Sequence, residues 1–235
     1  MIYAIVGPTG VGKTKLSIEL AKRINAEIIN CDSMQVYKEL NIGVAKIKEQ
    51  EKDGIAHHLF DIVSVDDEFN AFLYQEIGRK VIDDLINKHK NIIVVGGTGL
   101  YLKALLYDYT FKSNDSKKRL YDFKLIALTR DRNKLYDDIN KRVDKMIDEG
   151  LIEEAKGLYN KKDTKALKTA IGYKELFLYF DGILSKEDAI NKIKQVSRNY
   201  AKRQYTFFKH QFDNVSWYDV DTLSINEIVN DIIKK

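Results

Sequence analysis

The 235-residue sequence contains one cysteine, one proline and one tryptophan, and it has no long apolar run. The single cysteine, Cys31, excludes an intramolecular disulfide and fits a reducing compartment, where we expect its thiol to serve packing. The apolar run Ile2–Val6 is too short for the core of a signal peptide, and no later run reaches a membrane-spanning length. The sequence therefore predicts a cytoplasmic protein without a membrane partner.

A large excess of charge of one sign is also missing, because 39 Lys and Arg residues face 35 Asp and Glu residues and leave a net charge of +4. This mild balance permits a nucleotide or RNA partner without requiring one. Hydrophobic residues make up 44% of the chain, enough for a substantial core in one domain. We expect residues 1–235 to form a single domain and a monomer, since no feature indicates an obligate protein partner.

Short β-rich runs alternate with longer segments of helical periodicity. The predicted strands are Ile2–Val6, Glu27–Asn30, Asn91–Val95, Lys124–Leu128 and Val215–Tyr218. The predicted helices are Lys15–Ile24, Ala71–His89, Lys134–Glu149 and Lys186–His210, the last with a basic outer face. This alternation indicates parallel βαβ units, and it predicts an α/β fold with a P-loop NTPase-like parallel sheet, flanking helices and a C-terminal helical portion.

Between the first strand and the first helix stands Gly7-Pro8-Thr9-Gly10-Val11-Gly12-Lys13-Thr14, the pattern of a phosphate-binding P-loop. Its glycines allow consecutive backbone N–H groups to turn toward an anion. Lys13 adds a positive charge, and Thr14 can bind Mg²⁺ at the positive end of the helix. The sequence therefore predicts a site for a diphosphate or triphosphate, in preference to an ordinary strand-to-helix turn.

Asp32 follows the second predicted strand. The carboxyl end of that strand faces the same crevice as the P-loop in an open parallel sheet, so we expect Asp32 to point at the substrate. A carboxylate there can accept a proton or bind Mg²⁺ through water. The alternative is a helix cap formed by Asp32 or Ser33.

The third predicted strand ends in Gly96-Gly97-Thr98 and not in the carboxylate that P-loop ATPases place there for the metal. Glycines at this position indicate that the backbone approaches a ligand or another segment closely, and they argue against a motor ATPase. A tight turn with Thr98 as helix N-cap explains the pattern equally well.

Arg130 and Arg132 flank the start of the helix after the fourth strand, where guanidinium groups suit bidentate contact with phosphate. We predict Arg130 as the clamp on the leaving group, with a surface salt bridge as the alternative. His57 and His58 lie close to Asp61, but adjacent histidine side chains diverge on most backbones and no cysteine is near. No metal site is expected there.

The sequence resembles the tRNA dimethylallyltransferase family in an ordered set of motifs that runs almost from end to end. The motifs are the P-loop, Asp32–Tyr37, His57–Ile62, Gly96–Tyr101, Leu128–Arg130, Arg142–Met146, Ala170–Glu175 and Ser197–Gln204. A P-loop alone is common to many families, whereas this ordered set is specific.

The resemblance implies Mg²⁺-dependent transfer of a dimethylallyl group from dimethylallyl diphosphate to the exocyclic amine of the adenosine beside the anticodon, with release of diphosphate. Lys13, Thr14 and Arg130 would stabilise the departing diphosphate together with Mg²⁺, which Thr14 would bind, with Asp32 through water. Asp32 would also accept the proton of the amine. Contacts with the anticodon stem-loop of tRNA are implied for Asp32, Ser33, Met34, Gln35, Thr98, Thr169, Gly172, Tyr173, Lys174, Arg198, Lys202, Arg203 and Gln204.

The chain departs from the family in one segment. The family usually carries a helical insertion of many tens of residues between the helix after Gly-Gly-Thr and the strand before Thr-Arg, where this chain has only residues 112–122, a polar and turn-prone stretch. This stretch fits a solvated surface loop or a basic loop that touches phosphate. If the protein truly lacks the insertion, we expect weakened tRNA binding with an intact diphosphate site.

Three other functions stay open at this point. The same chemistry could prenylate a free adenine nucleotide, because only the acceptor would change. A P-loop small-molecule kinase or a nucleotide-binding module without catalysis would also use the P-loop. The missing carboxylate after the third strand argues against the kinase, and a pure binder gives no reason for Asp32 and Arg130 to meet at one crevice.

Overall fold

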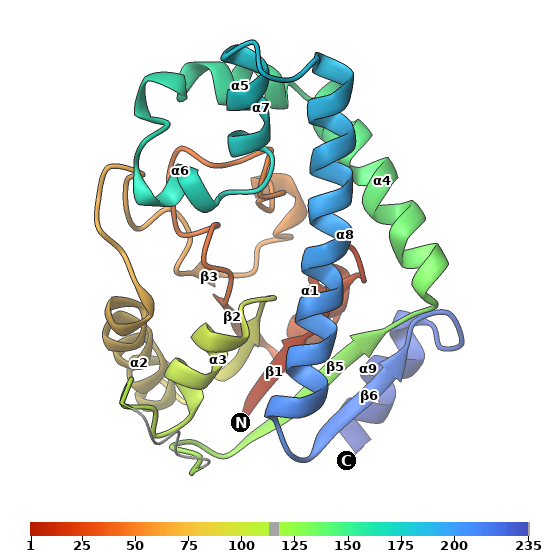
Figure 1. The fold of residues 1–235 in the computed structure, drawn as a ribbon. Coiled ribbons are helices and arrows are strands. Elements are labelled where there is room, and N and C mark those ends of the chain that lie inside the picture. Colours follow the sequence, from red (N-terminus) through yellow and green to blue (C-terminus); the bar gives the residue numbers. More distant parts are fainter. Residues whose placement is uncertain (113–117, 235) are drawn as a thin grey trace.

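The computed structural model describes residues 1–112 and 118–234 of the chain (Figure 1). Within this described part, six parallel strands form one sheet in the order β3-β2-β4-β1-β5-β6. The strands are β1 (Ile2–Val6), β2 (Ala26–Asn30), β3 (His57–His58), β4 (Asn91–Val95), β5 (Phe123–Thr129) and β6 (Val215–Asp219). The prediction of a parallel α/β sheet is confirmed, and each of the five predicted strands is found within one residue at both ends.

The helices of the described residues include the four that periodicity predicts, with ends that differ by at most two residues. They are α1 (Lys13–Ile24), α2 (Ala71–Asn87), α3 (Gly99–Leu106), α4 (Arg132–Asp148), α5 (Leu151–Gly157), α6 (Lys165–Thr169), α7 (Tyr173–Phe180), α8 (Lys186–Gln211) and α9 (Ile225–Lys234). Side-chain caps define three of the starts, since Asn70, Asp131 and Ser185 accept hydrogen bonds from the first backbone N–H groups of α2, α4 and α8.

The sheet is covered on both faces, because side chains alternate between its two sides. Helices α1 and α9 cover one face, where the buried side chains are Ile5, Ile28, Ile93, Ile126, Leu16, Leu20, Ile228 and Ile232. Helices α2, α3 and α8 cover the other, where they are Ala4, Ile29, Val94, Ala127, Tyr74, Leu102, Leu105 and Phe208. Burial on both faces explains why the central strands are almost wholly apolar.

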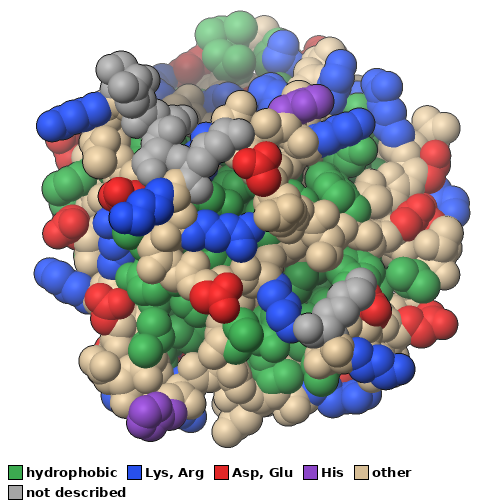
Figure 2. Space-filling model, turned by 90° about the horizontal axis from the view of Figure 1, so that it is seen from below, with side chains coloured by type: hydrophobic (Ala, Val, Ile, Leu, Met, Phe, Trp, Pro, Cys, Tyr) green, Lys and Arg blue, Asp and Glu red, His purple; other side chains and the backbone are tan. Residues whose placement is uncertain are grey.

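The carboxyl ends of the strands point toward α5, α6 and α7, which lie at the top of Figure 1, while α8 runs along the whole height of the molecule. The loops after β1, β2 and β4 therefore lie at this end of the sheet. Figure 2 shows the opposite end, where charged side chains of both signs are scattered among apolar ones. None of the helices in the described residues has the length and apolar character needed to cross a membrane.

The segment 112–122, assigned above to a shortened insertion, lies partly outside the described residues, at 113–117. Its two flanks lie side by side: Asp108 N donates to Lys118 O at 2.9 Å, and Leu120 N donates to Leu106 O at 3.0 Å. Because the chain leaves and rejoins the core at neighbouring points, segments of different length fit here without disturbing the sheet.

Candidate active site

The loop between β1 and α1 has the backbone that a P-loop requires. Gly7, Gly10 and Gly12 have φ values of 140°, 82° and 100°, which favour glycine. Gly7 also packs so closely that a Cβ atom would lie 2.7 Å from the carbonyl oxygen of Leu128. The predicted sequence of strand, glycine-rich loop and helix is confirmed, and the loop leads directly into the N-terminus of α1, the end of a helix that favours an anion.

Lys13 lies inside this loop. Its Nζ donates to the carbonyl oxygens of Gly7 and Pro8 at 2.9 and 2.8 Å. Burial lowers the pKa of Lys13 to about 7; the nearby Arg142 lowers it further, and Asp32 opposes the shift. The ammonium group is thus held without a carboxylate bonded to it, which leaves its charge for a bound anion.

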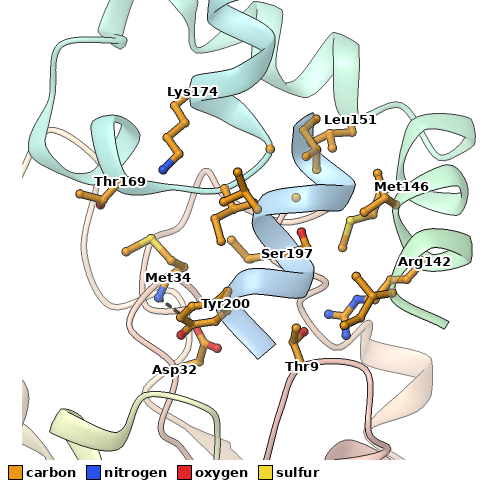
Figure 3. Close-up of a pocket in the computed structure, with 18 of the residues that line it drawn as sticks. Thr9, Asp32, Met34, Arg142, Met146, Leu151, Thr169, Lys174, Ser197 and Tyr200 are labelled. Atoms are coloured by element: carbon orange, nitrogen blue, oxygen red, sulfur yellow. Dashed lines mark hydrogen bonds between the residues drawn. The ribbon is translucent and has the colours of Figure 1, made fainter. Parts of the chain in front are cut away.

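Asp32 lies in a turn that the side chain of Asn30 stabilises by hydrogen bonds. The buried Asn30 side chain accepts from Asp32 N at 3.1 Å and donates to Leu59 O at 3.0 Å. One carboxylate oxygen of Asp32 accepts from Met34 N at 2.9 Å (Figure 3). No helix begins at this turn, so the local bond fixes the carboxylate and the alternative of a helix cap is wrong.

Two adjoining cavities meet at these groups. The first, of about 240 Å³, lies between the loops after β1 and β2 and helices α4 to α8, and apolar side chains form much of its wall (Figure 3). The second, of about 140 Å³, contains the P-loop and is lined by both Lys13 and Asp32. The residues shared by the two cavities are Thr9, Asp32, Val44, Arg142 and Tyr200. The P-loop cation and the carboxylate therefore face one continuous space.

Arg142 is a site residue to which the sequence analysis gave no role. It lies in the middle of α4 and lines both cavities. Burial lowers its pKa, and Asp32 opposes the shift. The sequence does contain an indication of this role. Ile139, Arg142 and Val143 share one face of the predicted helix, because they are three and four residues apart. An arginine on an apolar face indicates a buried partner or an anion.

The prediction of Arg130 as the leaving-group clamp is wrong. Its guanidinium is bonded to Asp138 and, at 2.9 Å, to Asp221, and it lines neither cavity. Asp221 also accepts from Asp131 N at 2.8 Å. Arg130 therefore connects the start of α4 to the segment after β6. The structure thus supports the alternative of a salt bridge.

Two residues implied to contact tRNA have other roles in the structure. Tyr173 is fully buried and donates its hydroxyl to Glu154. Gln204 is 5% exposed; its Oε1 accepts from Thr9 N at 2.8 Å and its Nε2 donates to Gly97 O at 3.0 Å. Direct contact of these side chains with RNA is therefore wrong, and Gln204 instead braces the P-loop against the glycine turn after β4.

Most of the remaining residues implied for tRNA lie around the first cavity or on α8. Those that line the cavity are Asp32, Ser33, Met34, Thr169, Gly172, Lys174 and Arg203. Arg198 is half-buried and donates to Asn140, whereas Lys202 is exposed. Gln35 lines the P-loop cavity and donates to the carbonyl oxygens of Val44 and Ala45. None of these positions conflicts with an RNA contact.

The glycine turn after β4 brings Thr98 close to the loop after β2, which contains Asp32. Thr98 Oγ1 accepts from Ser33 N at 3.0 Å and makes no side-chain cap bond to α3. The expectation of close backbone approach is confirmed, since a Cβ atom on Gly96 would lie 2.0 Å from Cys31 O, and one on Gly97 would lie 2.0 Å from Gln204 Nε2.

Gly96→Ala is expected to destabilise the fold by about 1–3 kcal/mol, because the backbone of Cys31 must move to admit a methyl group. Gly157→Ala is the matched control, since Gly157 is the last residue of α5 and has nothing within 4 Å of a Cβ position. It should be neutral or up to about 1 kcal/mol more stable. Thermal unfolding of both variants measures the difference, and equal melting temperatures would contradict the close packing.

Several known proteins are similar to this chain in sequence and fold. The sequence matches the family model for IPP transferases over residues 35–120 and 110–211. It is 41% identical to a tRNA dimethylallyltransferase of Anoxybacillus flavithermus, over 97% of this chain and 95% of that protein. It is 40% identical to one of Bacillus subtilis, over 93% and 90%. The crystal structure of the tRNA isopentenylpyrophosphate transferase from Bacillus halodurans superposes with a TM-score of 0.91 at 36% identity, covering 99% of this chain and 95% of that one.

The comparison also shows a difference in length. The alignment with the Anoxybacillus protein extends over 297 positions, so at least 62 of them have no counterpart among the 235 residues here. The two parts of the family match meet at residues 110–120, next to the segment where we predict a shortened insertion. With two fifths of its residues identical to these relatives and the same fold, the chain belongs to the IPP transferase family of tRNA dimethylallyltransferases.

Proposed function

We propose that this chain transfers the dimethylallyl group of dimethylallyl diphosphate to the exocyclic amine of the adenosine beside the anticodon of tRNA. The observation that carries the proposal is that Lys13 of the P-loop and the carboxylate of Asp32 line one cavity. We propose that the protein acts as a monomer. We propose a cytoplasmic location, in line with a tRNA substrate.

The leaving group is stabilised by positive charge that the fold holds in place. As the bond between the allylic carbon and oxygen loosens, negative charge grows on the diphosphate. Lys13 and Arg142 line the cavity where that charge develops, together with Thr9, Gly10 and Gly12 of the P-loop. Fixed donors and cations of this kind lower the barrier because they need no reorganisation during the reaction.

The acceptor amine is deprotonated from the other side. Asp32 lies where the P-loop cavity joins the first cavity, and Asn30 and Met34 N fix its turn. The apolar side chains of the first cavity offer a surface for the dimethylallyl group and keep it from water. They are Met34, Val44, Ile139, Val143, Met146, Leu151, Ile171, Ile193 and Val196.

The site also fits Mg²⁺. Thr14 and Asp32 line the same cavity, and oxygen ligands of this kind, completed by phosphate oxygens and water, suit the ion. Among the described residues no group of three or more His, Cys, Asp or Glu side chains could form a protein-only metal site. We propose Thr14 as the protein ligand, with Asp32 binding through water; the bound ion would neutralise charge on the diphosphate.

The tRNA would approach from the end of the cavity away from the P-loop. Figure 3 shows Thr169 and Lys174 on the far side of the cavity from Thr9. Arg203 lines this cavity and also a neighbouring groove along α8, together with the exposed Lys202. Cations along such a path suit the phosphates that flank an adenosine inserted into the cavity.

Mass analysis of nucleosides tests the proposal. The chain is incubated with Mg²⁺, dimethylallyl diphosphate and an unmodified anticodon stem-loop, and a dimethylallyl-adenosine with stoichiometric diphosphate is expected. Parallel incubations with free AMP and with labelled ATP test the nucleotide prenyltransferase and the kinase. Product on AMP but not on the stem-loop, or phosphate transfer from ATP, would contradict the proposal.

Donor binding is expected to depend on pH through Lys13. With a pKa of about 7 in the free protein, the Lys13 amine is mostly neutral at pH 8, and a bound diphosphate favours its charged form. Binding should therefore take up nearly one proton at pH 8 and almost none at pH 6, and affinity should fall by up to about tenfold per pH unit above 7.

Isothermal titration of dimethylallyl diphosphate in two buffers of different ionisation enthalpy measures this uptake. Lys13→Met is the control, since the donor's own titration stays while that of Lys13 is removed. Equal proton uptake by the two proteins at pH 8 would contradict the assignment.

A further inference from the structure

Residues 41–47, which we call the wall loop, separate the reaction space from an outer cavity. Gly43 and Val44 line the first cavity, while Val44, Ala45 and Ile47 line the P-loop cavity. On its other side, the wall loop borders a cavity of about 630 Å³ that also reaches Thr14 and Arg142. A small displacement of this loop would therefore open the diphosphate site to solvent.

The wall loop has no regular secondary structure to hold it in place. Its own backbone bonds form a turn, with Ala45 N donating to Ile42 O and Lys46 N to Asn41 O, both at 2.9 Å. Ala45 has a φ of 44°, a conformation that costs energy for a residue with a side chain. Contacts from outside the loop must therefore fix it.

Glu154 of α5 provides one such contact. Its carboxylate accepts from Ile42 N at 3.0 Å and from Gly43 N at 3.2 Å. Hydrogen bonds between backbone N–H groups and an ionised carboxylate are stronger than those between neutral groups. On the other side of the loop, Gln35 Nε2 donates to Val44 O at 3.0 Å.

Tyr173 holds Glu154 in this position. Its hydroxyl donates to Glu154 Oε1, and its ring lies so near Gly43 that a Cβ atom there would be 2.5 Å from a ring carbon. Tyr173 is fully buried at the start of α7, and burial together with Glu154 raises its pKa, so the hydroxyl keeps its proton. The ring and the carboxylate thus enclose the backbone of the wall loop.

We propose that Glu154 and Tyr173 are positioning residues that keep the wall loop closed and so keep water away from the allylic carbon of the donor. The inference rests on the proposed function. When the loop opens, a water oxygen bonds to that carbon as its bond to the diphosphate breaks. One water proton goes to solvent, and the products are dimethylallyl alcohol and diphosphate. Exclusion of water from a reactive intermediate is a general task of closed sites.

Tyr173→Phe tests the proposal with least disturbance, because the ring over Gly43 stays and only the hydroxyl is lost. The measured quantity is the ratio of dimethylallyl alcohol to prenylated adenosine, with excess anticodon stem-loop and donor. We expect this ratio to rise roughly fivefold in Tyr173→Phe, and more in Glu154→Gln, whose amide oxygen is uncharged and a weaker acceptor.

Tyr159→Phe is the matched control. Tyr159 also donates its hydroxyl to a carboxylate, that of Asp181, but neither residue touches the wall loop. The ratio of dimethylallyl alcohol to prenylated adenosine in Tyr159→Phe should equal that of the wild type. Amide hydrogen exchange of peptides covering residues 41–47 gives a second readout that needs no turnover, and we expect roughly tenfold faster exchange in Tyr173→Phe and Glu154→Gln alone.

The outcomes separate the two proposals. Lack of prenylated adenosine with the wild-type chain would refute the proposed function, and the exchange measurement would still test whether the pair positions the loop. An unchanged ratio and unchanged exchange in both variants, or lower melting temperatures with an unchanged ratio, would overturn the inference. Equal changes in Tyr159→Phe would also overturn it, since they would indicate general loosening.

Discussion

Asp32→Asn is expected to lower the rate of prenyl transfer by about 10²–10⁴-fold, because an amide cannot accept the proton of the adenosine amine. The substitution keeps the shape of the side chain and an oxygen that can accept from Met34 N. Donor affinity should change far less than the rate, because removal of a negative charge beside the diphosphate offsets the loss of the proposed water-mediated Mg²⁺ contact and of the Asp32 charge that favours protonated Lys13. Single-turnover formation of prenylated adenosine, with donor affinity measured separately, checks both statements.

Asp137→Asn is the matched control for this prediction. Asp137 is exposed on α4 and lines none of the reaction cavities, so its variant should react at the wild-type rate. If Asp32→Asn kept more than a tenth of the wild-type rate, Asp32 would not be the proton acceptor. A loss of donor binding equal to the loss of rate would instead give Asp32 a role in holding the donor complex.

The fold could be predicted because its central strands are buried on both faces and its strands lie between helices. Such strands are short apolar runs between longer helical segments, and five strands were predicted from runs of this kind. The edge strand β3 was missed because it has two residues and exists only through its pairing with Ile28 and Ile29 of β2. Its pairing depends on the tertiary fold, and His57 and His58 carry no local strand pattern.

The central residues of the site could be predicted because they come directly after the carboxyl ends of strands. The P-loop and Asp32 follow β1 and β2, so a parallel sheet brings them together, and the structure places both at one cavity. The same reasoning failed for Arg130, which also follows a strand but meets the carboxylates of Asp138 and Asp221. Which acidic groups surround an arginine is decided by segments far away in the sequence.

Buried polar side chains were the hardest to interpret from sequence. Gln204 lies in a basic stretch that suits RNA, yet helical geometry turns it inward to the P-loop while Lys202 and Arg203 stay outside. Tyr173 likewise stands in a motif implied for tRNA and is fully buried against Gly43. A resemblance carries over the residues of a motif, but only the packing shows which of them face the substrate.

Arg142→Gln is expected to lower the rate of prenyl transfer by about 10²–10³-fold, the usual effect of removing one preorganised group that stabilises transition-state charge. Donor affinity should fall less, because negative charge on the diphosphate is largest after the carbon–oxygen bond has loosened. Loss of Arg142 should also raise the pKa of Lys13, since Arg142 is one cause of its depression. Proton uptake on donor binding should then appear at a higher pH than in the wild type.

Arg130→Gln is the comparison that decides between the two arginines. Arg130 is bonded to Asp138 and Asp221 outside the cavities, so its variant should transfer the prenyl group at close to the wild-type rate. The free energy of unfolding should decrease by about 0.5–1 kcal/mol, because two carboxylates lose a partly exposed partner. A large rate loss in Arg130→Gln with a small one in Arg142→Gln would reverse the assignment and restore Arg130 as the group that meets the diphosphate.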